Sequence, residues 1–220
     1  MTKLDAAYMP SKSGNVRQLV VFLHGYGANG EDLLSIGDEW RDALQDAVFV
    51  SPNAPEICEA FAGGFQWFSI RAIDRDAFER ERQIEKAAPV LNDFLDSQLA
   101  HWNLDESALA VVGFSQGAMM AMYTMPRRAK ACAGVIGYSG MLISAAGLKA
   151  PDISKMPVLA VHGAEDTIVP PTSLTHVAEG FEAAGFNVET VMRPHLAHGI
   201  DAFGITRGQA FLQDCFGLNT

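Results

Sequence analysis

The chain has 220 residues, of which 16 are basic and 26 acidic, so its formal net charge at pH 7 is −10. This length is typical of one domain, and the apolar share of 49% is enough to form a buried core. The acidic balance argues against nucleic acid as a partner, because phosphate binding needs clustered Lys and Arg. We expect a single domain over residues 1–220.

The cysteine content and the apolar segments indicate where the protein works. Three widely spaced cysteines (Cys58, Cys132 and Cys215) form neither a disulfide framework nor a zinc motif, so we expect no metal site. The first residues lack the apolar segment of a signal peptide. The longest apolar stretch, Ala108–Met125, is interrupted by Gly and Ser and is typical of a strand, turn and helix. These features predict a cytoplasmic protein without stable membrane insertion.

Short apolar runs alternate with longer amphipathic segments along the chain. The runs predict strands at Gln18–His24, Ala47–Ser51, Ala108–Phe114, Ala133–Ser139, Val158–His162 and Asn187–Arg193. The longer segments predict helices at Glu31–Gln45, Glu79–Trp102, Ser115–Arg128, Thr172–Ala184 and Asp201–Phe216. Pro89 predicts a kink or break near Ala88 in the second helix. The alternation predicts an α/β fold in which helices cover both faces of a mostly parallel sheet, with no large lid domain.

Residues 52–76 have no regular period and carry Gly63-Gly64 among aromatic side chains. This composition predicts an apolar loop over a substrate site. Several apolar residues here and near residue 141 are candidates for an acyl pocket: Phe61, Phe65, Trp67, Phe68, Ile70, Met141 and Leu142. Trp67 and Phe68 are the preferred candidates in this set. The methionines of the Ser115–Arg128 helix, Met119 among them, are expected to fill the core instead.

The sequence Gly113-Phe114-Ser115-Gln116-Gly117 directly follows a predicted strand and opens a predicted helix. This arrangement is typical of a nucleophile elbow, a tight turn that holds a serine in a strained conformation above the sheet. The glycines remove side chains that would collide in such a turn, and the helix N-terminus favours negative charge. We therefore predict Ser115 as the nucleophile. A glycine-rich turn with a helix-capping serine is the structural alternative.

A serine hydroxyl needs a base within hydrogen-bonding distance before it can attack a carbonyl. His198 follows the last predicted strand and precedes the final helix, where strand ends of a parallel sheet present their ligands. We predict His198 as the base, with His195 as the alternative. The remaining histidines lie in helical patterns or end strands, where surface or buried structural roles are expected: His24, His101, His162 and His176.

The acid of a serine hydrolase with such an elbow lies between the serine and the histidine in chain order. Asp166 lies a few residues after the strand Val158–His162 and is the predicted partner of the imidazole. Glu165 is its rival, and Asp152 is a weaker one. A turn aspartate that caps the next helix is the structural alternative.

An oxyanion hole is predicted from the segment Leu23-His24-Gly25-Tyr26-Gly27, which follows the first apolar strand. Its glycines let the backbone approach the serine closely. The backbone N–H groups of Tyr26 and Gln116 are the predicted donors to the substrate oxyanion. A plain glycine-rich turn is the alternative.

These segments together resemble the phospholipase/carboxylesterase family of α/β-hydrolases, which includes bacterial carboxylesterases and acyl-protein thioesterases. The resemblance lies in LHGYGANGEDL, QWFS, GFSQGAMMA, HGAEDTIVP and HLAHGI, spread from Leu23 to Ile200. It implies an α/β-hydrolase fold, a small-molecule ester as substrate, no cofactor, and dimers, which are common in the family. It also assigns Ser115, Asp166 and His198 to the triad, the amides of Tyr26 and Gln116 to the oxyanion hole, and Trp67 and Phe68 to the acyl site.

The function predicted from these residues is a serine carboxylesterase for short- to medium-chain esters. With no basic cluster near the site to bind a phosphate head group, neutral carboxylic esters are favoured. A lysophospholipase or an acyl-protein thioesterase is the alternative, although the tyrosine of His-Gly-Tyr-Gly and residues 194–197 differ from the thioesterase branch. A dienelactone-type hydrolase is a disfavoured alternative, because that family typically carries cysteine where the elbow has Ser115. A peptidase is a further alternative, less favoured because a single domain leaves no room for an added lid or propeller. A catalytically silent binding module is the alternative from another class.

Overall fold

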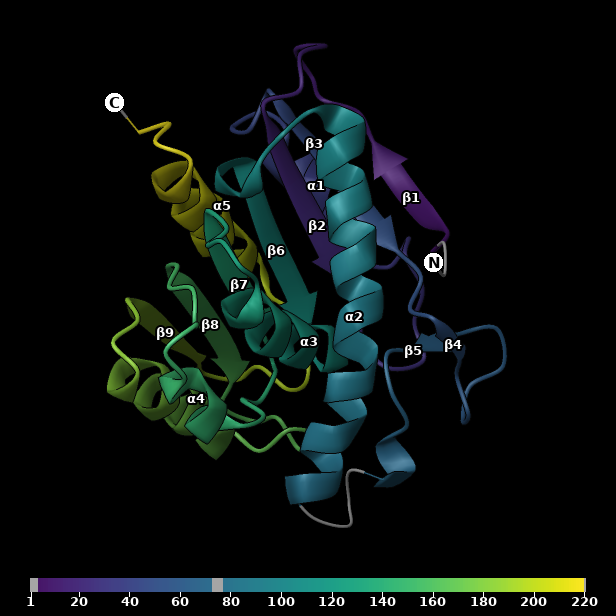
Figure 1. Ribbon diagram of the computed structural model, residues 1–220, viewed down its shortest axis with the longest axis vertical. Coiled ribbons are helices and arrows are strands. Elements are labelled where there is room, and N and C mark those ends of the chain that lie inside the picture. The colour runs from purple at the N-terminus through teal and green to yellow at the C-terminus, as the bar shows by residue number, and fades with distance from the viewer. Residues whose placement is uncertain (1–3, 73–76, 220) are drawn as a thin grey trace.

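The computed structural model of the protein describes residues 4–72 and 77–219. Its central sheet has the strand order β1-β3-β2-β6-β7-β8-β9 (Figure 1). The strands of this sheet are β1 (Ala6–Met9), β2 (Gln18–Leu23), β3 (Ala47–Pro52), β6 (Leu109–Phe114), β7 (Gly134–Tyr138), β8 (Val158–Gly163) and β9 (Val188–Arg193). β1 is antiparallel to β3, and each of the other neighbouring pairs is parallel. The predicted mostly parallel α/β sheet is confirmed.

Helices pack on both faces of the sheet (Figure 1), and the hydrophobic core forms two clusters, one on each face. The helices are α1 (Leu34–Trp40), α2 (Ala77–Trp102), α3 (Gln116–Thr124), α4 (Thr172–Ala183) and α5 (Ala202–Cys215). One cluster contains buried side chains of α2, α3 and α4, such as Ile84, Met120 and Phe181. The other contains side chains of α1 and α5, such as Trp40 and Leu212. Strands β2, β3 and β8 are buried at every residue, because helices cover both of their faces.

Three features differ from the sequence predictions or were absent from them. The edge strand β1 was not predicted, and residues 52–72 contain a short antiparallel pair, β4 (Glu56–Ile57) and β5 (Phe65–Gln66). Helix α2 continues through Pro89 without ending, so the predicted break is wrong. Pro89 is exposed, and so is Glu85, whose carbonyl loses its hydrogen bond to the proline. Water can therefore satisfy that carbonyl. Residues 73–76 of the predicted loop lie outside the described residues.

The parallel strands bring distant segments of the chain to one edge of the sheet. Strands β2, β6, β8 and β9 all end at this edge, as their pairing register requires. The loops that follow them carry Tyr26, Ser115, Asp166 and His198 in that order. Open α/β sheets bind their ligands at the carboxyl ends of their strands. The fold thus gathers the residues singled out in the sequence at a single location.

Candidate active site

Ser115 lies at a tight turn between β6 and α3. Its backbone has φ 53° and ψ −114°, a strained conformation for a residue with a side chain, and its N–H donates to Tyr138 O at 2.9 Å. A Cβ on Gly117 would lie 1.9 Å from Leu23 O, and one on Gly113 would lie 2.3 Å from the backbone of Gly117. Glycine is therefore required on both sides of Ser115. The Ser115 hydroxyl does not cap α3, so the helix-capping alternative does not describe it.

Asp166 and His198 form a hydrogen-bonded pair at the same edge of the sheet. The His198 Nδ1–H donates to Asp166 Oδ2 at 2.7 Å, while Asp166 Oδ1 accepts the N–H groups of Ile168 and Val169 at 2.9 Å each. Burial alone would raise the pKa of Asp166, but the hydrogen bonds from His198 and these amides hold it below its ordinary value. The carboxylate is thus ionised and fixes the His198 tautomer that leaves Nε2 able to accept a proton.

Ser115 and His198 line one cavity, although no hydrogen bond of 3.5 Å or less joins their side chains within the described ranges. Such contacts are often long in free enzymes and shorten when substrate binds. The ring of Phe114 lies beside that of His198, with 4.9 Å between their centroids. The residue that precedes the serine thus packs against the His198 ring.

None of the other predicted candidates takes the place of this pair, although His162 Nε2 lies 3.3 Å from Asp166 Oδ2. His195 is exposed and accompanies Glu165, which is also exposed, at 3.1 Å on the outside of the loop. His24 is buried, its Nδ1–H donates to Gly25 O and its Nε2 accepts the Ala54 N–H. Burial lowers the pKa of His24, so this ring stays neutral. His162 is also buried and donates to Val169 O at 3.0 Å.

The backbone N–H groups of Tyr26 and Gln116 are both available at the cavity. Both residues line it, and neither amide donates to an acceptor in the described parts of the chain. Gln116 is the first residue of α3, whose opening N–H groups have no acceptor within the helix. Gly25 and Gly27 flank Tyr26, and a Cβ on Gly27, at φ +81°, would lie 2.5 Å from the Phe61 ring. Both residues predicted to form the oxyanion hole therefore lie at the cavity that contains Ser115.

A buried hydrogen-bond network connects Gln116 to residues 67 and 68. The Gln116 side chain accepts the Trp67 N–H and donates to Phe68 O, both at 2.8 Å. The Trp67 indole N–H donates to His24 O at 3.0 Å. Trp67 and Phe68 are only 1% and 2% exposed and are not lining residues of the cavity. The structure places them in the core behind its wall, so we do not assign them a contact with substrate.

The cavity beside Ser115 has a volume of about 700 Å³ and a largely apolar wall. Of the side chains proposed from sequence, Phe61, Ile70 and Met141 line it, whereas Phe65 and Leu142 do not. Met119 also lines it, although it was expected only to fill the core. The lining residues that sequence reasoning missed are Ala28, Asp32, Ala60, Arg80, Ile168, Val169 and Pro170. The last three come two to four residues after Asp166 in the chain, a signal that could have identified them.

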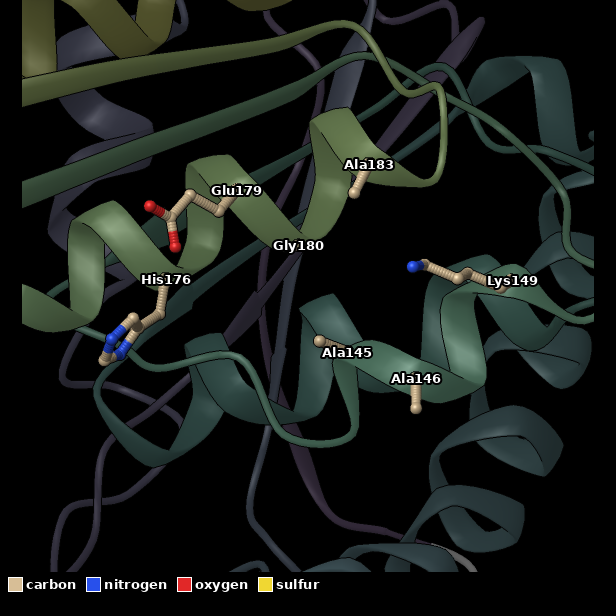
Figure 2. A pocket seen from close by; sticks show the side chains of 7 residues that line it. All are labelled: Ala145, Ala146, Lys149, His176, Glu179, Gly180 and Ala183. Carbon is tan, nitrogen blue, oxygen red and sulfur yellow. The ribbon is translucent and has the colours of Figure 1, made fainter.

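A second hollow lies between α4 and the 3-10 helix η4 (Ala145–Lys149), as Figure 2 shows. His176 and Glu179 of α4 project at one side of it, and Lys149 projects from η4 at the other. Its volume is about 440 Å³, and it shares no lining residue with the cavity beside Ser115. None of the residues predicted to be catalytic lies in this hollow.

Comparison with known proteins identifies the group to which this arrangement belongs. Residues 4–216 match the family model described as phospholipase/carboxylesterase. The chain belongs to the phospholipase/carboxylesterase family. The protein is accordingly a hydrolase of carboxylic esters with the α/β-hydrolase fold, as the resemblance in the sequence implied. No helix among the described residues is long and apolar enough to cross a membrane.

Relatives in sequence and in structure agree with this membership. The chain is 30% identical to acyl-protein thioesterase 1 of Schizosaccharomyces pombe over 69% of each chain. It is 26% identical to esterase YpfH of Escherichia coli over 90% of this chain and 83% of that one. Among solved structures, esterase PE8 is 36% identical, with a TM-score of 0.92 over 97% of this chain and 100% of that chain. These family members have esterase or thioesterase names.

Proposed function

We propose that the protein is a serine carboxylesterase that hydrolyses short- to medium-chain esters through an acyl-enzyme on Ser115. The observation that carries the proposal is a strained serine on the wall of an apolar cavity that also contains His198, which is held by buried Asp166. Two backbone amides at this cavity donate to no acceptor in the described part of the chain. Each of these groups has one role in acyl transfer. The family membership supports the reaction class.

In the proposed reaction, His198 Nε2 accepts the Ser115 proton as the oxygen attacks the ester carbonyl. The amides of Tyr26 and Gln116 bind the resulting oxyanion, and each such donor typically contributes about 3 kcal/mol to transition-state stabilisation. Asp166 stabilises the imidazolium, which then gives its proton to the leaving alcohol. Water enters by the reverse of this route, so that the acid is released and Ser115 is restored.

The cavity supports esters of modest length. Its wall is formed by Phe61, Ile70, Met119, Met141, Ile168 and Val169 on the apolar side. Ligand pockets of comparable size, about 300–1,000 Å³, bind small molecules whose surface they bury. We infer that the acyl chain lies against this wall, within the cavity and not along a long surface groove.

The proposal is tested with p-nitrophenyl esters graded from acetyl to dodecanoyl, using the wild type and Ser115→Ala. We expect a short- to medium-chain optimum and a loss of about four orders of magnitude or more in kcat for the variant, whose fold should be unchanged. Near-normal turnover by Ser115→Ala would refute the assignment. A dodecanoyl optimum would refute the proposed chain length and favour a lysophospholipase or a thioesterase.

An acyl-protein thioesterase is the second candidate, because a relative that covers 69% of the chain has that name. Parallel assays with a matched octanoyl ester and octanoyl thioester distinguish the two, and we expect the ester to be the better substrate.

Cytoplasmic location and a homodimer stay predictions. The second is checked by light scattering on the eluting protein, which should give twice the chain mass of 23.7 kDa.

A further inference from the structure

A smaller hollow adjoins the catalytic cavity at Phe114, the residue whose ring contacts that of His198. It has a volume of about 280 Å³ and is lined by Asp32, Leu33, Ser35, Ile36, Phe114, Ile200 and Ile205. Asp32 and Phe114 also line the catalytic cavity, so the two hollows share a boundary. We propose that this hollow is the binding site for the alcohol part of the ester, and that it selects bulky apolar alcohols that are neutral or cationic.

Apart from the residues that they share, the two hollows are lined by different core clusters, which lie on the two faces of the sheet. Met119 and Val169 of the catalytic cavity belong to the core cluster of α2, α3 and α4. Leu33 and Ile36 of the smaller hollow belong to the cluster of α1 and α5, and Phe114, Ile200 and Ile205 pack against it. Ser115, at the end of β6, lies between the two faces. An ester bound at Ser115 thus has one apolar wall available for each of its halves.

The chemistry decides which half of the ester faces which wall. His198 must protonate the leaving oxygen, so the alcohol leaves from the side of the His198 ring. That ring lies against Phe114, 4.9 Å between centroids, and Phe114 is part of the smaller hollow. The alcohol is therefore directed towards α1 and α5, and the acyl chain towards Met119 and Met141. This assignment rests on the proposed function.

The charge at the boundary adds a preference. Asp32 is exposed and has no ion-pair partner among residues 4–72 and 77–219. Its carboxylate attracts a cationic alcohol and repels an anionic one, such as the phosphoglycerol of a lysophospholipid. Arg80, the basic residue that lines the catalytic cavity, comes from α2 on the opposite face. The site therefore favours carboxylic esters of bulky apolar alcohols, neutral or cationic, over phospholipids.

The first test keeps the acid constant and varies the alcohol. Methyl and cyclohexyl butanoate are compared in the wild type, in Ser35→Phe, which fills the hollow from an exposed position, and in Glu39→Phe. Glu39 lies on the same helix α1, is exposed and is outside the hollow. We expect Ser35→Phe to lower kcat/KM for the cyclohexyl ester about tenfold or more, and that for the methyl ester less than twofold. Glu39→Phe should change neither.

The second test isolates charge with choline butanoate and its neutral isostere, 3,3-dimethylbutyl butanoate. At low ionic strength we expect the wild type to favour the cationic ester by about fivefold in kcat/KM, and Asp32→Asn to lose that preference. Added salt should weaken it in the wild type. Hydrolysis of the butanoyl-enzyme, measured in a single turnover, should be the same in all variants because the alcohol has already left.

These outcomes separate the two proposals. Ser115-dependent hydrolysis that responds equally to both alcohols in Ser35→Phe, or a charge preference that persists in Asp32→Asn, would overturn the alcohol site and leave the esterase intact. A changed acyl-length optimum in Ser35→Phe would also overturn it, since the hollow would then bind the acid. Absence of any Ser115-dependent hydrolysis would overturn the proposed function, and this inference with it.

Discussion

The side chain of Gln116 provides the sharpest test of how the site is held together. Its amide is buried, 2% exposed, and forms two hydrogen bonds of 2.8 Å to the backbone of Trp67 and Phe68. Gln116→Met keeps an unbranched side chain of similar length but removes both bonds. The Trp67 N–H and the Phe68 carbonyl then stay buried without a partner.

The expected cost follows from these two groups. An unsatisfied buried backbone group costs about 1–3 kcal/mol, so two of them predict a loss of about 2–6 kcal/mol in the free energy of unfolding. This is a large part of the 5–15 kcal/mol typical of a whole domain. The N–H of Gln116 is also a proposed oxyanion donor. Loss of the side-chain hydrogen bonds that hold residue 116 in place should therefore lower kcat by about tenfold or more.

Urea unfolding and esterase assays measure the two effects separately. Gln45→Met is the matched control, because Gln45 is exposed and, among the residues that the structure describes, its side chain donates only to Asp42 O at 3.3 Å. That control should stay within about 0.5 kcal/mol of the wild type. If Gln116→Met were as stable as this control, the network would not hold residues 67 and 68, and the reasoning would be refuted.

Three further predictions concern the triad, the elbow and pH. Asp166→Asn would present an amide N–H to His198 and fix the wrong tautomer, so kcat should fall about 10³–10⁴-fold. Glu165→Gln, on the exposed side of the loop, is the control and should change kcat less than twofold. Equal losses of kcat in the two variants would contradict the assignment of Asp166. Gly117→Ala brings a Cβ to 1.9 Å from Leu23 O, so it should lower the free energy of unfolding, measured by calorimetry, by at least about 2 kcal/mol and remove most activity. Gly199→Ala is the control and should change the free energy of unfolding little, because the nearest atom to its added Cβ lies at 4.0 Å. Burial lowers the pKa of His24 below 6.5, so the unfolded chain binds a proton at this ring at a higher pH than the folded protein does. The free energy of unfolding should therefore fall as the pH drops through 6.5, by at most about 1.4 kcal/mol per pH unit from this group. His24→Gln should flatten the dependence of unfolding free energy on pH between 7.5 and 5.5, and an unchanged slope would contradict the buried neutral histidine.

The sequence predicted the elements whose pattern is local and strong. Continuous apolar runs identified β2, β3, β6 and β8, because a strand covered on both faces has no polar alternation. β1 was missed because Ala6–Met9 is short and lies at the sheet edge, where burial leaves little pattern. Pro89 was interpreted as a kink or break in the helix because sequence alone does not show that it faces solvent.

The candidate site was predictable where a residue's place follows from the order of elements. Ser115, Asp166 and His198 were predicted because each lies within a few residues of the end of a strand, and the structure brings all three to one edge of the sheet. The burial of Trp67 and Phe68 was not predicted, because an aromatic residue in a loop without a regular period packs equally well into a core or against a cavity. Their burial depends on the Gln116 side chain, which lies almost 50 residues further along the chain.

The most direct test of the central claim is to identify the residue that becomes covalently modified. The protein is treated with a fluorophosphonate probe and its intact mass and peptides are determined, for the wild type, Ser115→Ala and Ser139→Ala. We predict one adduct, on Ser115, that is absent from Ser115→Ala and retained in Ser139→Ala. No adduct on the folded wild type, or an adduct that persists in Ser115→Ala, would contradict a serine esterase built on this residue.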